Sequence, residues 1–510
     1  MQTWNLILSL LPIGAVILLM LRFRWKSTHA GIVGWASAML IAGLRFGAGC
    51  QVLLWAQVRG LFLALYVLYI IWGALLFYRV TDATGTIKAM AEVLRRISPN
   101  RSVQVLLLAW GFASFLQSVS GFGVPVAIVA PLLVGMGFTP LAAVVLPSLG
   151  HAWAVTFGSL GSSFYALMAA TGLEGHILAP WSANYSGIIC LLTGAATLWA
   201  AGGLPAIRQG AAPLLLMGIS AAATQWLVAR ADLWSIAAMC GSLAGLAVGS
   251  LWAFRRTRSN AGALANTAQL TQALRPYAIL LGFILTAKFW TPLSSALDST
   301  VLRVSVPEVT TALGWTTPAG TTRSLSLLGH TGALLIYASV LIFLIARRQG
   351  VLPPGSGGKI LKDVTRRGLK STVGVLAMVT LAATMDHAGM INTISETLAA
   401  ATGAYFTILP PFIGALGAFV TGSNTNSNVL FGALQRDIAQ ALHYTVPLIL
   451  AAQNVGASLG STFAPAKVIV GCSTVDAADQ ESDVMRWLLR YDLAALGLLA
   501  LFTWTAAYFL

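Results

Sequence analysis

The stretch "GFASFLQSVSGFGVPVAIVAPLLVGMG", residues 111–137, decides the fold class, because a polar segment interrupts a pattern typical of a membrane helix. The interrupting segment contains Gln117, Ser118, Ser120, Gly121, Gly123 and Pro125. Irregular backbone survives at membrane depth only inside protein or beside a water-filled cavity, since hydrocarbon offers its amides no hydrogen-bond partners. The stretch therefore predicts a discontinuous membrane helix whose break lines a cavity.

The composition places the whole chain in a membrane. Of its 510 residues, 57% are hydrophobic and only 9% are charged, whereas a soluble domain carries about 25% charged residues. Apolar stretches long enough to cross a bilayer recur from end to end, and we expect about 12 to 14 crossings in an all-α, polytopic fold. Residues 4–21 lack a preceding positive region and a small-residue cleavage site, so we expect a retained first helix.

The net charge of +15 could indicate nucleic-acid binding, but the positions of the charges argue against it. Lysines and arginines gather in short clusters between apolar stretches, at 22–26, 88–101, 255–258 and 347–370. This pattern is typical of cytoplasmic loops and predicts a multi-pass protein of the plasma membrane with both termini outside. The four cysteines form no C-x-x-C pair, so neither a disulfide framework nor a zinc site is indicated.

The interrupted pattern occurs twice, which predicts two repeat-like halves with discontinuous or re-entrant helices. Residues 255–275 form a cytoplasmic linker between an N-terminal half, 1–254, and a C-terminal half, 276–510. The breaks lie near 118–125 in the first half and 421–428 in the second. Matched interruptions of this kind are typical of transporters that bind their solute between internal repeats.

The segments around the breaks complete the predicted organisation. After each break comes a second apolar helix that contains several glycines and polar residues, which we call a softened helix. The two are "PSLGHAWAVTFGSLGSS" at 147–163 and "LAAQNVGASLGSTFAPAK" at 450–467. We further expect an amphipathic surface helix at 81–101, an external loop at 295–330 and a second cytoplasmic linker at 347–370.

The breaks provide the chemistry for binding a small anion. Half-helix N-termini present unpaired N–H groups and a partial positive charge to an anion's oxygens. The alternative is a helix kinked at Pro125 and relieved by packing. We predict substrate binding by Gln117, Ser120, Gly121, Gly123, His151, Gly422, Ser423, Asn424, Asn426, Asn454 and Lys467.

Three stretches together resemble the bacterial lactate permease family. They are "GFASFLQSVSGFGVPVAIVAPLLVGMGF", "FVTGSNTNSNVLFGALQ" and "LAAQNVGASLGSTFAPAKVIVGCS", in the order found in that family. The resemblance implies import of L-lactate, D-lactate, glycolate or a related 2-hydroxy monocarboxylate with protons.

Several residues depart from the family pattern. Gln117 stands where the family usually has a glutamate, Asn424 where it often has an aspartate, and His151 where it has an asparagine. Ala466 and Lys467 replace a Gln–Ser pair, and Asp386 and His387 stand where uncharged residues are usual.

The departures direct attention to three ionisable residues. We predict that Asp386 or His151 carries the proton and that Lys467 holds the carboxylate, because charged groups within a bilayer are costly and mark function. Each has an alternative without such a role. Asp386 would be a carboxylate near the external interface, His151 a histidine hydrogen-bonded within the core, and Lys467 a lysine that snorkels to the surface.

Other function classes are less well supported. A sodium-coupled anion transporter is the alternative, because "SNTNSN" (423–428) offers carbonyls and amides for Na⁺, and an anion channel is a further one. "GASLG" (456–460) matches a hydrolase motif that needs a strand-to-helix turn, and "GSGGK" (355–359) is an incomplete phosphate loop. We therefore expect no enzyme, cofactor, metal or nucleic-acid partner. The expected partners are the small carboxylate and membrane lipid, with the oligomeric state left open.

Overall fold

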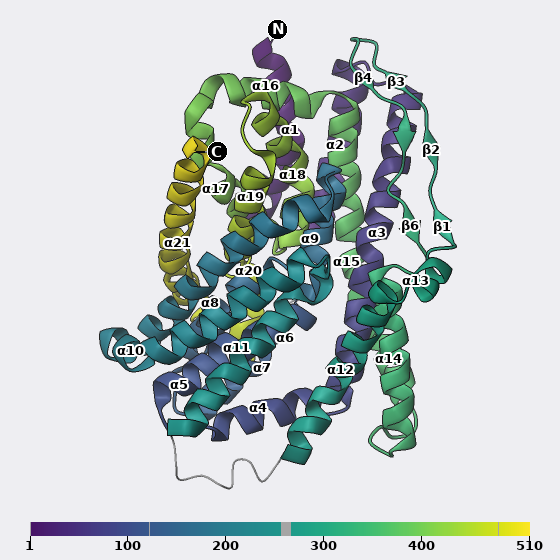
Figure 1. The fold of residues 1–510 in the computed structure, drawn as a ribbon. Helices are drawn as coiled ribbons and strands as arrows, with labels where there is room; N and C mark the ends of the chain where they lie inside the picture. The colour runs from purple at the N-terminus through teal and green to yellow at the C-terminus, as the bar shows by residue number, and fades with distance from the viewer. Residues whose placement is uncertain (1, 122, 257–266, 478, 510) are drawn as a thin grey trace.

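The computed structural model describes residues 2–121, 123–256, 267–477 and 479–509. These residues form an almost wholly helical bundle (Figure 1), which confirms the all-α, polytopic prediction. Within the described ranges, 10 helices are long and apolar enough to cross a membrane, or up to 12 if two sharply bent pairs each count as one span.

The N-terminal part, up to the 257–266 segment, contains the first broken helices. Its α-helices are α1 (Gln2–Leu21), α2 (Ser27–Arg45), α3 (Cys50–Ala83), α4 (Thr86–Arg96), α5 (Arg101–Val105), α6 (Ala113–Val119), α7 (Val124–Gly135), α8 (Pro140–Gly150), α9 (Gly158–Thr171), α10 (Gly175–Arg230) and α11 (Trp234–Arg256). A π-helical segment, η1 (Leu106–Phe112), joins α5 to α6, and a 3₁₀ turn, η2 (Ala152–Val155), lies between α8 and α9.

The C-terminal part contains the second broken helices. Its helices are α12 (Thr267–Phe289), α13 (Thr291–Leu297), α14 (Thr331–Arg348), α15 (Ser356–His387), α16 (Met390–Thr402), η3 (Gly403–Ile408), α17 (Pro410–Thr421), α18 (Asn424–Ala441), α19 (Val446–Gly460), α20 (Pro465–Ser473) and α21 (Glu481–Phe509). The order of broken pairs is therefore the same in both parts: α6 and α7 then α8 and α9, and later α17 and α18 then α19 and α20.

Helix α10 is a hairpin rather than one continuous span. Its 56 residues would extend about 84 Å as a straight helix, far beyond the roughly 30 Å of a hydrocarbon core. The backbone leaves the helical region at Gly202 and Gly203. Beyond this point the second arm folds back on the first, so that Gly187 lies against Ala222 and Gly210 lies against Leu198. Each arm is therefore long enough to cross a hydrocarbon core by itself.

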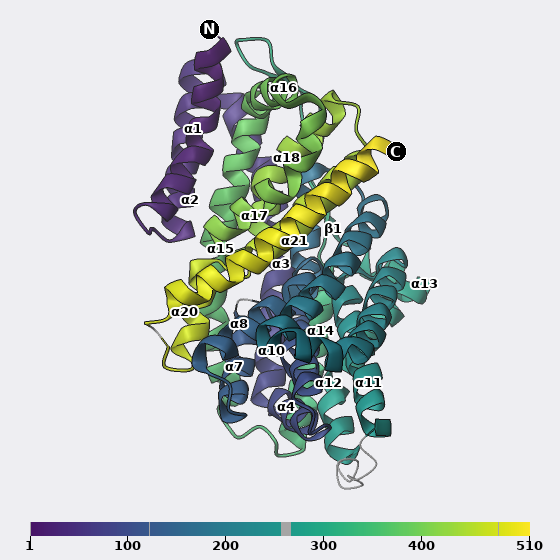
Figure 2. The same cartoon turned by 90° about the vertical axis from the view of Figure 1, so that its left-hand side faces the viewer.

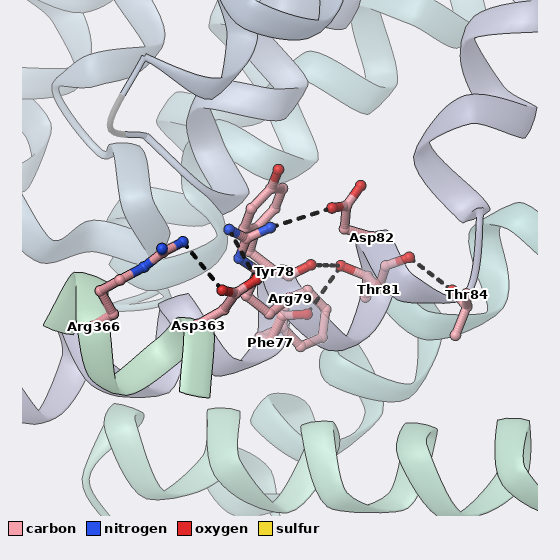
Figure 3. A network of polar contacts seen from close by, with 8 residues as sticks. All are labelled: Phe77, Tyr78, Arg79, Thr81, Asp82, Thr84, Asp363 and Arg366. Atoms are coloured by element: carbon pink, nitrogen blue, oxygen red, sulfur yellow. Dashed lines mark hydrogen bonds and ion pairs between the residues drawn. The ribbon is translucent and has the colours of Figure 1, made fainter. Parts of the chain in front are cut away.

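The second predicted linker, 347–370, is mostly helical. Helix α14 ends at Arg348 and α15 begins at Ser356, so only a short turn separates them. An ion-pair network holds the start of α15 against the end of α3 (Figure 3): Asp363 lies 3.6 Å from Arg79, which also lies 3.6 Å from Asp82. These contacts hold the first turns of α15 against α3, so the part of the predicted linker from Ser356 onward is helical.

The segment predicted as an external loop, 295–330, contains a long antiparallel hairpin. Three two-residue ladders run along it: β1 (Val301–Leu302) with β6 (Leu325–Ser326), β2 (Ser305–Val306) with β5 (Gly320–Thr321), and β3 (Val309–Thr310) with β4 (Thr316–Thr317). The sequence pattern missed it because each ladder is too short for an alternating apolar signal. The tip of the hairpin and both termini lie toward one end of the molecule, and α4 lies at the other end (Figure 1).

The two halves are packed together rather than separate. Helix α3 lies along α14 and α15, and α9 packs on α18. Helix α19 contacts α17, α18, η2 and α10. Helix α21 crosses this arrangement diagonally, with α20 at its beginning (Figure 2). As a result the broken helices of both halves meet inside the bundle.

Candidate functional site

A small cavity lies where broken helices of both halves meet. Its volume is about 60 Å³, enough for a few water molecules or a small solute, since one water needs roughly 10–15 Å³ on this measure. Polar and small residues dominate its lining. The lining residues are Gln117, Val155, Gly158, Ser159, Ser162, Ser163, Gly422, Ser423, Asn424, Thr425 and Lys467.

The first break brings backbone close to the neighbouring broken helix. Helix α6 ends at Val119, and Gly121 adopts a φ of 65°, which L side chains rarely adopt. A Cβ atom on Gly121 would overlap the Ser159 hydroxyl. Ser159 in turn donates a hydrogen bond to the Ser120 carbonyl, 3.4 Å away. Glycine is therefore required here both for the backbone conformation and for the close approach.

The connection from α8 to α9 forms one wall of the cavity. Ser159 and Leu160 adopt positive φ values of 49° and 53°, so the chain makes a left-handed turn before α9 continues. Ser163 closes this turn by donating to the Val155 carbonyl at 2.8 Å. The turn presents Ser159 and Ser162 to the cavity.

The second break presents a helix N-terminus to the cavity. Gly422 adopts a φ of 71°, as expected for a glycine at a break, and Ser423 caps α18 by accepting a hydrogen bond from the Asn426 amide at 3.4 Å. The first N–H groups of a helix have no intrahelical acceptor and carry its positive dipole end. The start of α18, at Asn424 and Thr425, faces the cavity, so it can bind an anion.

A network of amides fixes the position of that N-terminus. Asn424 donates to Asn454 Oδ1 and to Ser458 Oγ, both at 3.0 Å, and Asn428 donates to the same Asn454 oxygen at 2.9 Å. All of these side chains are buried. Buried hydrogen bonds of this kind make the second break rigid.

Lys467, at the start of α20, supplies a positive charge to the cavity. Its ammonium donates to Ser461 Oγ at 3.0 Å. In the part of the chain that the structure describes, no acidic oxygen lies within 4.0 Å of this ammonium. An ammonium group has three donors and keeps a full charge to offer a ligand. Lys467 is thus the cation of this site.

Several buried polar atoms near the breaks lack a hydrogen-bond partner among the described residues, and Gln117 Oε1, Asn424 Oδ1 and His151 Nε2 are among them. Leaving such a group unsatisfied costs about 1–3 kcal/mol. Gln117 and Asn424 line the cavity, so a bound solute or water can satisfy their acceptors. His151 Nδ1 lies 2.5 Å from the Pro147 carbonyl and must donate to it, which leaves the lone pair on Nε2.

The structure brings together some of the predicted site residues and not others. Gln117, Gly422, Ser423, Asn424 and Lys467 line the cavity. The remaining predicted binding residues are absent from its described lining: Ser120, Gly121, Gly123, His151, Asn426 and Asn454.

Asp386 lies away from the cavity. It is near the end of α15, its side chain is 41% exposed, and its carbonyl accepts a hydrogen bond from Trp315 at 3.2 Å. Trp315 belongs to the hairpin within 295–330, the segment predicted as an external loop. The predicted role of Asp386 in carrying a proton therefore has no support from the geometry of the site.

Sequence reasoning missed the serine wall of the cavity. Ser159, Ser162 and Ser163 lie within the stretch 147–163, which was identified as a softened helix but yielded only His151 as a candidate. The run "GSLGSS" (158–163) was the available signal, because it combines two flexible glycines with three hydroxyl groups close to a predicted break.

A sequence profile described as L-lactate permease matches residues 5–510 of this chain. The chain belongs to the L-lactate permease family. Members of the family with similar sequences include the L-lactate permease of Streptococcus iniae, 30% identical over 88% of this chain and 93% of that protein. Glycolate permease GlcA of Escherichia coli (strain K12) is 26% identical over 98% of this chain and 95% of that protein.

The L-lactate permease of Bacillus subtilis (strain 168) is 26% identical over 94% of this chain and 92% of that protein. Among solved structures, the Alcanivorax borkumensis YdaH transporter is similar with a TM-score of 0.45 and 13% identity. That similarity covers 88% of this chain and 86% of that one. Membership of the family confirms the resemblance carried by the three quoted motifs.

Proposed function

We propose that this protein imports a small 2-hydroxy monocarboxylate, L-lactate, D-lactate or glycolate, by proton symport across the bacterial plasma membrane. The observation that carries the proposal is Lys467, a cation without an acidic partner among the described residues, in a cavity beside the N-terminus of α18. The names of the relatives, L-lactate permease and glycolate permease, support the same substrate class.

The cavity matches both functional groups of such a substrate. The carboxylate binds the Lys467 ammonium and the first N–H groups of α18, which together supply charge-assisted hydrogen bonds. The 2-hydroxyl group donates to Gln117 Oε1 or Asn424 Oδ1, the buried acceptors that lack a partner among the described residues. The small volume favours acids of two or three carbons.

Protons make import possible against the membrane potential. Moving an anion alone into a negative interior is opposed by roughly 2.3 kcal/mol per 100 mV, and a proton entering with it removes this cost. His151 is a candidate proton carrier because its Nε2 lone pair is buried and unpartnered among the described residues. Asp386, the other candidate, lies outside the cavity. Both termini lie on the periplasmic side in this proposal.

The test is uptake of radiolabelled L-lactate and glycolate by the purified protein in proteoliposomes, with the pH and Na⁺ gradients varied independently. We expect accumulation above the external concentration when the outside is acid, with no effect of Na⁺. Accumulation driven only by Na⁺ would support the sodium-coupled alternative instead. Uptake that stops at equal concentrations under every gradient would indicate a channel and refute the proposal.

A further inference from the structure

The last helix carries a buried carboxyl group that the proposed binding site does not use. Asp492 lies in α21 and is 1% exposed. The 17 residues from Leu493 to Phe509 carry no charge and span roughly 26 Å of helix, most of a hydrocarbon core of about 30 Å. Asp492 therefore lies near one end of the apolar part of α21 and is buried in protein, where an ionised carboxylate costs several kcal/mol unless it is paired or protonated.

The surroundings of Asp492 offer it no counterion. The helices α8, α17 and α19 pack against α21 and contain no ionisable side chain. Within the described ranges, no cationic nitrogen lies within 4.0 Å of its carboxyl group. The ionisable groups on the other elements that pack against α21 are Lys467 and Cys472 on α20, Tyr405 on η3, and His176, Tyr185, Cys190, Arg208 and Arg230 on α10. On α21 itself they are Glu481, Asp483, Arg486, Arg490, Tyr491 and Tyr508.

The hydrogen bonds at Thr462 depend on whether Asp492 carries a proton. The Thr462 hydroxyl oxygen lies 2.7 Å from Asp492 Oδ2 and 2.8 Å from the Leu459 carbonyl. A hydroxyl has one proton to donate, and a carbonyl oxygen can only accept. Both contacts are hydrogen bonds only if Asp492 is protonated and donates to Thr462. When Asp492 is ionised, the Thr462 hydroxyl must turn its proton to the carboxylate and loses its own hydrogen bond to the Leu459 carbonyl, which the Thr462 backbone N–H still contacts at 2.9 Å.

Thr462 lies in the same turn that holds Lys467. This turn, residues 461–464, joins α19 to α20, and its first residue, Ser461, accepts the hydrogen bond from the Lys467 ammonium at 3.0 Å. Ser461 also donates to the Ser458 carbonyl at 2.9 Å, and Ser458 Oγ accepts from Asn424 at the cavity wall. A continuous set of polar contacts therefore connects the cavity to the residue next to Thr462.

We propose that Asp492 binds the coupling proton, and that the turn at 461–464 transmits its protonation state to Lys467. This inference rests on the proposed proton symport and assigns the coupling proton to Asp492 in place of His151. With the proton bound, the Thr462 hydroxyl adds a second hydrogen bond to the Leu459 carbonyl beside that of its backbone N–H, and the turn keeps Lys467 in place for the substrate carboxylate. Loss of the proton rearranges the turn and favours release of the substrate.

The first test compares Asp492→Asn with the wild-type protein in proteoliposomes. Asparagine preserves the shape but cannot carry a proton, so accumulation driven by a pH gradient should be lost while exchange of internal for external L-lactate continues. Asp483→Asn is the matched control, because Asp483 lies on the same helix with its side chain 52% exposed, and it should accumulate substrate like the wild type. Full pH-driven accumulation by Asp492→Asn overturns the inference.

The second test is Thr462→Val. It tests the role of Asp492 independently if Asp492→Asn fails to reach the membrane or also loses exchange of internal for external L-lactate. Valine removes the hydroxyl's hydrogen bond with Asp492 in both protonation states, but the bond to the ionised carboxylate is the stronger one, so the pH profile of uptake should move by about one unit toward alkaline pH. An unchanged pH profile overturns the inference. A wild-type protein that accumulates neither L-lactate nor glycolate refutes the proposed function itself, which separates the two failures.

Discussion

The two breaks that meet at the cavity have different roles, although their sequences look alike. The first, between α6 and α7, is shaped by Gly121 and contributes Gln117 as its polar side chain at the cavity. The second, between α17 and α18, contributes a helix N-terminus held by an amide network and lies beside Lys467. The first break therefore determines how closely the walls approach, and the second provides most of the groups that can bind an anion.

The largest effect should come from closing the first break. Gly121→Val places a side chain on the Ser159 hydroxyl at a backbone conformation that valine disfavours. We expect uptake to be abolished with near-normal protein in the membrane. Gly135→Val is the control, since Gly135 lies on α7 with open space at its Cβ position. If Gly121→Val transports with unchanged affinity, the first break is a kink with no part in shaping the site.

A large but measurable effect should follow from removing the charge beside the second break. Lys467→Ala should raise the apparent substrate constant by roughly ten- to a hundredfold, because a hydrogen bond to a charged group contributes about 1.5–3 kcal/mol. Lys288→Ala removes the same charge from an exposed lysine paired with Asp232 at 3.3 Å and should leave uptake unchanged. Equal affinities for the two variants would remove the main difference between the breaks.

The smallest effect should come from the polar side chain of the first break. Gln117→Ala removes an acceptor proposed for the 2-hydroxyl group, so the apparent constant for L-lactate should rise about two- to tenfold, as expected for one neutral hydrogen bond. Inhibition of uptake by propionate, which lacks the hydroxyl, should stay the same. A parallel loss for both acids would show that Gln117 acts on the shape of the cavity instead.

Much of the fold could be predicted from the sequence because its signals are local. Apolar run length, the polar interruptions and the clusters of lysine and arginine indicated membrane helices, two breaks and matched broken pairs. The positive φ values of Gly121 and Gly422 agree with breaks at these positions, since glycine adopts such a backbone conformation without steric cost. The helical start of α15 was not predicted, because it is held by contacts with α3, which is far away in the sequence.

What the sequence by itself determined is therefore a membrane protein with two discontinuous helices and an excess of polar residues at both breaks. Only the tertiary structure decided which polar residues share the cavity and which aspartate is buried. Asp386 follows an apolar run yet is 41% exposed at the end of α15, whereas Asp492 follows Arg490 and Tyr491 and is 1% exposed. Depth and burial of a charged residue depend on how its helix tilts and packs against its neighbours, and neither is encoded in the local pattern.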